Sequence, residues 1–129
     1  MLNQKMKNTL EKYFNTIPEI MCVVLHGSIL TNYLRCDSDI DIAIVTSKKI
    51  TKLNLLNYAS ELESKLARQV DIGIISSDNL VYSKEALING KVLYCRNGFN
   101  YSLYKTNMLA MYLNFQDERK EIVNEYKNR

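Results

Sequence analysis

Two aspartates, Asp39 and Asp41, are the residues of this chain best suited to do chemistry. They flank Ile40 at the start of an apolar run that extends over residues 40–46. Side chains on one face of a β-strand repeat every two residues, so both carboxylates point the same way, with Cα atoms ~6.6 Å apart. Two such carboxylates can share a pair of Mg²⁺ ions, which sit ~3.5–4 Å apart in two-metal sites. We therefore predict that both aspartates bind Mg²⁺.

A Gly-Ser pair lies shortly before the aspartates and complements them. Gly27 and Ser28 follow a short apolar run, and ten residues separate Ser28 from Asp39. Glycine has no Cβ, so a phosphate can approach its backbone closely. A serine that begins a helix offers unpaired N–H groups and a hydroxyl to an anion. The pair is thus predicted to bind a polyphosphate.

A third carboxylate, Asp71, interrupts a later apolar run over residues 70–76. A buried carboxylate without a partner is costly, so it needs a metal ion or a hydrogen bond. If its strand neighbours that of Asp41, the two side chains lie about one strand spacing apart, ~4.8 Å. Asp71 could then bind the catalytic metal and accept the proton of an attacking hydroxyl.

Helices and strands that alternate along the chain must position these residues. Apolar residues at helical spacing predict helices over 2–16, 51–69, 79–89 and 101–128, and a short helix over 29–34 after Ser28. Short apolar or alternating runs predict strands over 20–25, 40–46, 70–76 and 91–96. Asp78 is a candidate N-cap for the third long helix. Such an order predicts an α/β fold with one sheet.

Length and composition place further limits on the protein. The 129 residues, 47% of them hydrophobic, suit one domain, with a core over about 1–96 and a C-terminal helix over about 101–128. The net charge of +3 is too small to indicate nucleic-acid binding. No run reaches the ~18 apolar residues of a membrane span, and the N-terminal segment is too polar for a signal peptide.

The few cysteines, histidines and glycines exclude several mechanisms. Four glycines permit neither a G-x-G-x-x-G motif nor a P-loop, and one histidine, His26, excludes a two-histidine zinc motif. We interpret His26 as a strand-end residue near the phosphates. Cys22, Cys36 and Cys95 are odd in number and widely spaced, which predicts reduced thiols in a cytoplasmic protein.

Taken together, the Gly-Ser pair, the Asp-Ile-Asp segment ten residues later and the lone Asp71 resemble the DNA-polymerase-β-like nucleotidyltransferase superfamily. The short chain is similar to its minimal branch, and in particular to the MntA-like antitoxins that are paired with HEPN-domain toxins. The resemblance covers about residues 1–96 well and the C-terminal helix more loosely. It implies a mixed sheet flanked by helices and one nucleotidyltransferase domain over residues 1–129.

The resemblance also implies roles for individual residues. Gly27 and Ser28 would contact the nucleotide phosphates, Asp39 and Asp41 would bind two Mg²⁺ ions, and Asp71 would complete the catalytic metal site. The implied reaction is transfer of AMP from ATP to a tyrosine of a HEPN-type toxin, within a homo- or hetero-oligomer. Many relatives have Phe where this chain has His26, and a small-basic-Gly pattern where it has residues 30–32.

Two other functions stay open from the sequence. One is transfer of a nucleotide to a small-molecule hydroxyl, as in aminoglycoside nucleotidyltransferases, which usually carry an additional helical domain. The other is a non-catalytic antitoxin that neutralises its toxin by occlusion, in which case Asp39, Asp41 and Asp71 would be remnants of a site.

Overall fold

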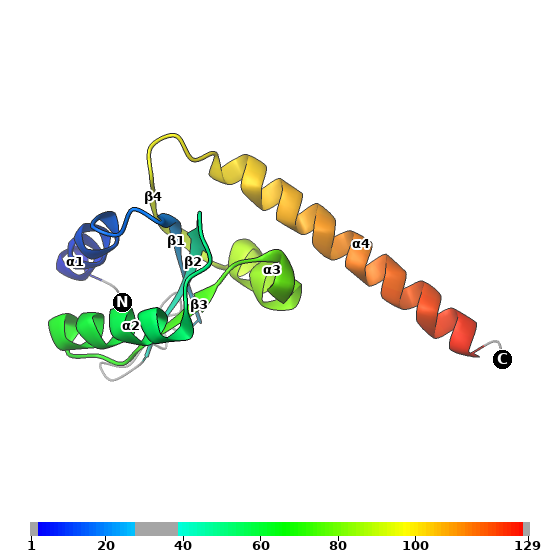
Figure 1. Ribbon diagram of the computed structural model, residues 1–129, viewed down its shortest axis with the longest axis horizontal. Helices are drawn as coiled ribbons and strands as arrows, with labels where there is room; N and C mark the ends of the chain where they lie inside the picture. Colours follow the sequence, from blue (N-terminus) through cyan, green and yellow to red (C-terminus); the bar gives the residue numbers. More distant parts are fainter. Residues whose placement is uncertain (1–2, 28–38, 128–129) are drawn as a thin grey trace.

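The computed structural model describes residues 3–27 and 39–127 (Figure 1). Its elements, in chain order, are α1 (Gln4–Asn15), β1 (Ile20–His26), β2 (Ile40–Thr46), α2 (Lys52–Leu66), β3 (Val70–Ile74), the 3₁₀ turn η2 (Ser77–Asn79), α3 (Leu80–Asn89), β4 (Lys91–Cys95) and α4 (Tyr101–Lys127). The four long helices and four strands expected from the sequence are all present, with ends that differ by a few residues. The short helix expected over 29–34 lies outside the described residues.

The four strands form one sheet in the order β3-β2-β1-β4. β1 pairs antiparallel with both β2 and β4, whereas β2 and β3 are parallel. This confirms the predicted mixed sheet. It also makes β3 an edge strand, so no other strand of the described residues covers the edge of the sheet that carries Asp71.

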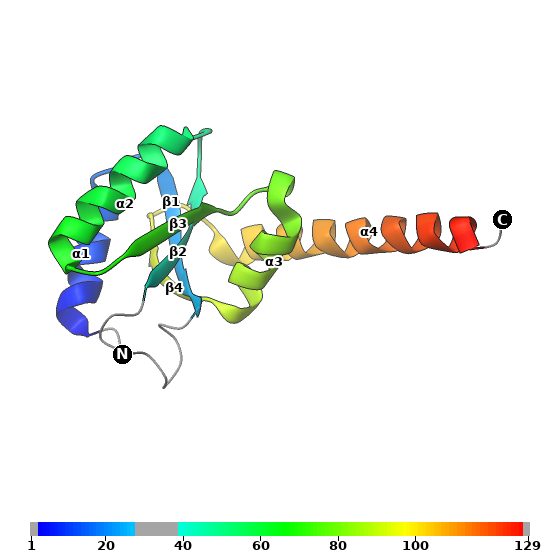
Figure 2. The same cartoon turned by 90° about the horizontal axis from the view of Figure 1, so that it is seen from below.

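Helices cover both faces of the sheet (Figures 1 and 2). On one face, α1 and α2 pack on alternate residues of β2, with Leu10, Phe14 and Leu62 fully buried against them. On the other face, α3 and the first turns of α4 pack in a second cluster that contains Ala43 and Met108. The odd-numbered residues of β2, including Asp41, belong to this second face because side chains alternate along a strand.

Helix ends follow from local capping, with one correction. The Asn3 side chain accepts a hydrogen bond from the backbone N–H of Met6, and Thr51 accepts one from Asn54, so both begin helices as N-caps. Asp78, the predicted cap of α3, instead lies inside η2, and Asn79 precedes α3 without a side-chain cap. The 3₁₀ turn thus leads into α3 in place of the side-chain cap that the sequence predicted.

The expectation of reduced thiols is wrong for two of the three cysteines. Cys22 and Cys95 form a disulfide between β1 and β4. The antiparallel register sets the two residues opposite each other, with Cα atoms 4.2 Å apart, although they are 73 positions apart in the chain. Spacing along a sequence says nothing about spacing across a sheet. Cys36 lies outside the described residues.

The C-terminal helix α4 extends away from the rest of the molecule (Figures 1 and 2). Its first turns contribute Tyr104 and Met108 to the core, whereas Met111 and Ile122 further along are 44% and 65% exposed. None of the helices in the described part of the chain is both long and apolar enough to cross a membrane.

Candidate active site

The candidate site is built on a row of residues that crosses three strands. Asp41 in β2 is the register partner of Asp71 in β3 and of His26 in β1. Register partners point to the same face of a sheet, and neighbouring strands are ~4.8 Å apart. The sheet therefore sets two carboxylates and an imidazole side by side. The predicted proximity of Asp41 and Asp71 is explained by the parallel pairing of their strands.

Asp39 stands just before β2, two residues from Asp41, and is exposed. It shares the face of Asp41 if the extended backbone continues to it. The three predicted carboxylates thus lie at one end of the sheet, with Asp41 in the middle. Asp71 is exposed at the edge strand, while Asp41 is half-buried.

Gly27 brings the start of the turn that is predicted to bind phosphates against Asp41. Its φ of +78° is in the left-handed region, which favours glycine. A Cβ at this position would collide with the Asp41 carboxylate oxygen Oδ2. The backbone at Gly27 is therefore as close to Asp41 as a glycine permits. Ser28 and residues 29–38 lie outside the described residues, so the structure does not place the predicted serine contact.

The Asp41 carboxyl has an unusual electrostatic environment. Burial raises its pKa above the usual range, the nearby His26 opposes this, and the carboxylates of Asp71 and Asp39 raise the pKa further. Like charges that crowd together disfavour ionisation. A cation bound between the carboxylates would remove this cost.

The residues present fit the Mg²⁺ that the carboxylate pattern implies. Within residues 3–27 and 39–127, no three His, Cys, Asp or Glu side chains converge into a ready-made metal site. Mg²⁺ does not need one, because it is usually held by one or two carboxylates and completes its shell with water and substrate phosphates. Adjacent carboxylates beside a turn that is predicted to bind phosphates fit such an open site.

Tyr82 in α3 belongs to this region and was missed by the sequence analysis. Its hydroxyl lies 3.1 Å from His26 Nε2, and the two rings meet edge to face with centroids 5.5 Å apart. Burial, with smaller contributions from Asp71 and Asp41, raises the pKa of Tyr82 to about 12. One signal could have pointed to it: Gly73 in the middle of β3, since a glycine inside a strand often marks a close approach of another group.

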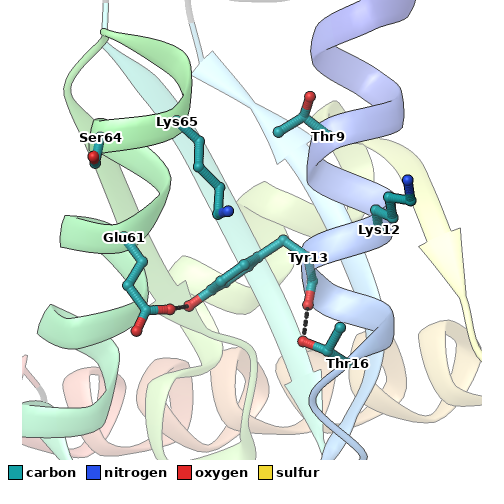
Figure 3. A pocket seen from close by; sticks show the side chains of 7 residues that line it. All are labelled: Thr9, Lys12, Tyr13, Thr16, Glu61, Ser64 and Lys65. Carbon is teal, nitrogen blue, oxygen red and sulfur yellow. Dashed lines mark hydrogen bonds between the residues drawn. The ribbon is translucent and has the colours of Figure 1, made fainter.

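Two of the hollows that the described residues form lie beside α2. One, of about 340 Å³, runs between α2 and the edge strand β3, and is lined by Leu55, Leu56, Val70 and Asp71 among others. The other, of about 630 Å³, lies between α1 and α2, on the face opposite the carboxylates. Figure 3 shows the Tyr13 hydroxyl crossing that second hollow to donate to Glu61 Oε2 at 2.5 Å. It contains none of the predicted site residues.

Comparison with known proteins agrees with this geometry. The sequence pattern of the family described as "Polymerase beta, Nucleotidyltransferase" matches residues 8–98, and the chain belongs to this family. The "Protein adenylyltransferase MntA" of Shewanella oneidensis is 26% identical over 111 residues, which cover 86% of this chain and 79% of that protein.

Two solved structures share the whole fold. The first, described as a toxin–antitoxin with AMP-PNP, superposes with a TM-score of 0.80 at 25% identity, covering 94% of this chain and 98% of that one. The second is a tri-AMPylated Shewanella oneidensis HEPN toxin in complex with MNT antitoxin. It gives a TM-score of 0.76 at 26% identity, over 96% of this chain and 98% of that one.

Proposed function

We propose that this protein transfers AMP from ATP to a tyrosine hydroxyl of a partner HEPN-type toxin, and so acts as the antitoxin of the pair. The observation that carries the proposal is the place of Asp41, which lies between the glycine turn at Gly27 and the edge-strand carboxylate of Asp71. Nucleotide phosphates and an acceptor hydroxyl can meet there. Relatives that bind AMP-PNP or accompany an AMPylated toxin support the same reaction. ATP is abundant in the cytoplasm, where we place the protein.

Each site residue has a role in this reaction. Gly27 and Ser28 bind the phosphates, and Asp39, Asp41 and Asp71 hold two Mg²⁺ ions. When bound, these ions neutralise the charge that develops on the transferring phosphate and on the leaving group. Gly27 fits its role because it has no Cβ on the side of the backbone that faces Asp41. The half-buried Asp41 fits a ligand position because a bound cation offsets the repulsion from its neighbours.

The acceptor approaches from the edge of the sheet. The tyrosine oxygen attacks the α-phosphorus, a new P–O bond forms, the bond to the β-phosphate bridging oxygen breaks and pyrophosphate leaves. Asp71, exposed on the edge strand, accepts the phenolic proton. Asp71 also lines the hollow of about 340 Å³ between α2 and this edge strand.

A protein acceptor suits the rest of the fold better than a small molecule. The described residues after β4 form one extended helix rather than a lobe that could enclose a small acceptor. A tyrosine carried on a partner's surface needs only an open edge and a docking surface. Its side chain is long enough to reach a carboxylate that the partner's backbone cannot approach.

Co-expression with the toxin encoded beside this protein tests the proposal. We expect the toxin tyrosine to become heavier by one or more AMP units, as measured by mass spectrometry of the intact toxin and its peptides. The Asp39→Ala/Asp41→Ala double variant should leave the toxin unmodified and active, since loss of either ligand should slow transfer by ~10³-fold or more. A folded double variant that neutralises an unmodified toxin as well as the wild type does would instead establish occlusion.

A further inference from the structure

The hydrogen bond between His26 and Tyr82 joins two parts of the site that the sequence separates by 56 residues. His26 ends β1, immediately before the Gly27 turn, and is the register partner of Asp41. Tyr82 lies in the first turn of α3. A side chain of α3 is thus connected to the residue that leads into the phosphate-binding turn.

Hydrogen bonds on α3 fix the position of Tyr82. The next residue, Ser83, is almost fully buried, and its hydroxyl donates to the carbonyl of Ser76 at 3.0 Å and accepts from the N–H of Ser76 at 2.9 Å. Both bonds attach α3 to the end of the segment that follows β3. The buried serine is therefore satisfied, and α3 is held at a fixed place over the sheet.

Gly73 provides the space that the Tyr82 hydroxyl occupies. Gly73 lies two residues after Asp71 in β3, on the same face, and its register partner is the small Ala43. A Cβ on Gly73 would collide with the Tyr82 hydroxyl. The phenol oxygen therefore lies over Gly73, two residues along β3 from Asp71, and from there it contacts His26 in β1.

We propose that Tyr82 is a positioning residue of the nucleotide site, and that it acts through His26 by holding the imidazole beside Asp41 at the entrance to the Gly27 turn. This inference rests on the proposed function, because it assigns the turn to the phosphates of ATP. His26 lies on the phosphate side, in β1, whereas Asp71, the proposed proton acceptor, is two strands away in β3. The pair therefore affects nucleotide affinity more than the rate of the chemical step.

His26 is the single histidine of the chain, so its ring nitrogens can be followed by NMR without ambiguity. Tyr82→Phe removes only the hydroxyl, and we expect it to move the Nε2 resonance of His26. The matched control is Tyr104→Phe, which removes another half-buried hydroxyl, one that donates to the Ile75 carbonyl at 3.3 Å. We expect the control to leave the His26 resonances unchanged. Equal spectra for wild type and Tyr82→Phe would overturn the proposal.

Calorimetry of Mg·ATP binding tests the consequence for the nucleotide and needs no toxin. We expect Tyr82→Phe to weaken binding by about three- to tenfold, the usual effect of one lost hydrogen bond, with Tyr104→Phe unchanged. His26→Phe/Tyr82→Phe should bind no more weakly than His26→Phe alone, since the two residues act as one unit. Additive losses, or equal losses in Tyr82→Phe and Tyr104→Phe, would show a general effect on the fold and overturn the positioning role.

The two proposals can fail separately. If the wild type binds Mg·ATP and Tyr82→Phe weakens binding while the toxin is never modified, the positioning role stands and the proposed acceptor is wrong. If the toxin is modified and Tyr82→Phe has wild-type affinity and turnover, the proposed function stands and the positioning role is wrong. Failure of the folded wild type to bind Mg·ATP would overturn both.

Discussion

Asp41 illustrates how a residue can serve chemistry at the expense of stability. It is half-buried between the Gly27 turn and Asp71, and burial together with neighbouring carboxylates raises its pKa. In the unfolded chain Asp71 is far away and the Asp41 carboxyl is fully solvated. The folded protein therefore bears a cost when Asp41 is ionised, and a bound cation would relieve that cost.

Asp41→Asn should make the metal-free protein more stable at neutral pH. Because the folded pKa lies above the unfolded one, the folded state holds more protons between the two values, and the free energy of unfolding falls as pH rises through that window. The full cost is present above the folded pKa and disappears below the unfolded one. Thermal unfolding should therefore show that Asp41→Asn raises the free energy of unfolding by less than ~1 kcal/mol at pH 7, because solvent screens the charges. This gain should vanish towards pH 3.

Asp117→Asn is the matched control for this measurement. Asp117 is an exposed carboxylate on α4, so its replacement should change stability by less than ~0.5 kcal/mol at either pH. Mg²⁺ should raise the unfolding temperature of the wild type and raise that of Asp41→Asn less. A destabilised Asp41→Asn at pH 7 would contradict the electrostatic argument.

How much of the site could be predicted depends on whether the signal is local. The sequence predicts directly, from the two-residue period of a strand, that Asp39 and Asp41 share a face, although β2 itself begins at Ile40, after Asp39. The pairing of Asp41 with Asp71 depends on which strands are neighbours in the sheet. The sequence does not determine that order, so it predicts their proximity only if the two strands are adjacent. Tyr82 could not be assigned, because only the packing of α3 over Gly73 brings its hydroxyl to His26.

At the scale of helices and strands, periodicity predicted which segments form elements, and local chemistry decided where they end. α2 stops at Leu66 because Ala67 adopts a left-handed conformation with φ of 54°, whereas its apolar pattern suggested a helix to residue 69. β3 ends at Ile74, and the backbone then enters η2. Such ends depend on single residues whose backbone conformation no periodic pattern specifies.

The pairing of β1 with β4 has a chemical consequence. It sets Cys22 opposite Cys95, which form a disulfide in the structure. We expect thiol titration of the denatured, unreduced protein to detect one free thiol, that of Cys36, and three after reduction. Cys36→Ser is the control, and it should lower the number of free thiols detected before reduction from one to none. Three free thiols before reduction, in protein purified without reductant, would mean that the strands pair without the covalent bond.

At the scale of the whole molecule, α4 is the element that the fold itself does not explain. An apolar stripe at helical spacing includes Tyr104 and Met108, which pack in the core, and continues to Met111 and Ile122, which are exposed. The 19 positions from Met108 to the end of α4 at Lys127 correspond to ~28 Å of helix. A helix that leaves its own core is marginal in water, so a partner that covers the stripe would stabilise it.

The exposed part of the stripe should therefore be needed to bind the toxin but not to bind the nucleotide. Met111 and Ile122 are eleven residues apart and lie on the same side of the helix, because eleven residues complete about three turns. Met111→Glu/Ile122→Glu should weaken toxin binding ~30- to 1,000-fold, since each side chain contributes ~1–2 kcal/mol when it is buried in an interface. Mg·ATP affinity and thermal stability should stay at wild-type values.

Leu113→Glu is the control that makes this test specific. Leu113 is 59% exposed on the same helix, but the helical repeat places it about half a turn away from Met111 and Ile122. Leu113→Glu adds a negative charge on a different side of α4, one charge against the two of the stripe variant. Calorimetry with an inactive variant of the toxin should therefore give near wild-type affinity for Leu113→Glu. Equal weakening by Leu113→Glu and by the stripe variant would point to the added charge rather than to the stripe. Weakening by Leu113→Glu alone would place the partner on the opposite side of the helix.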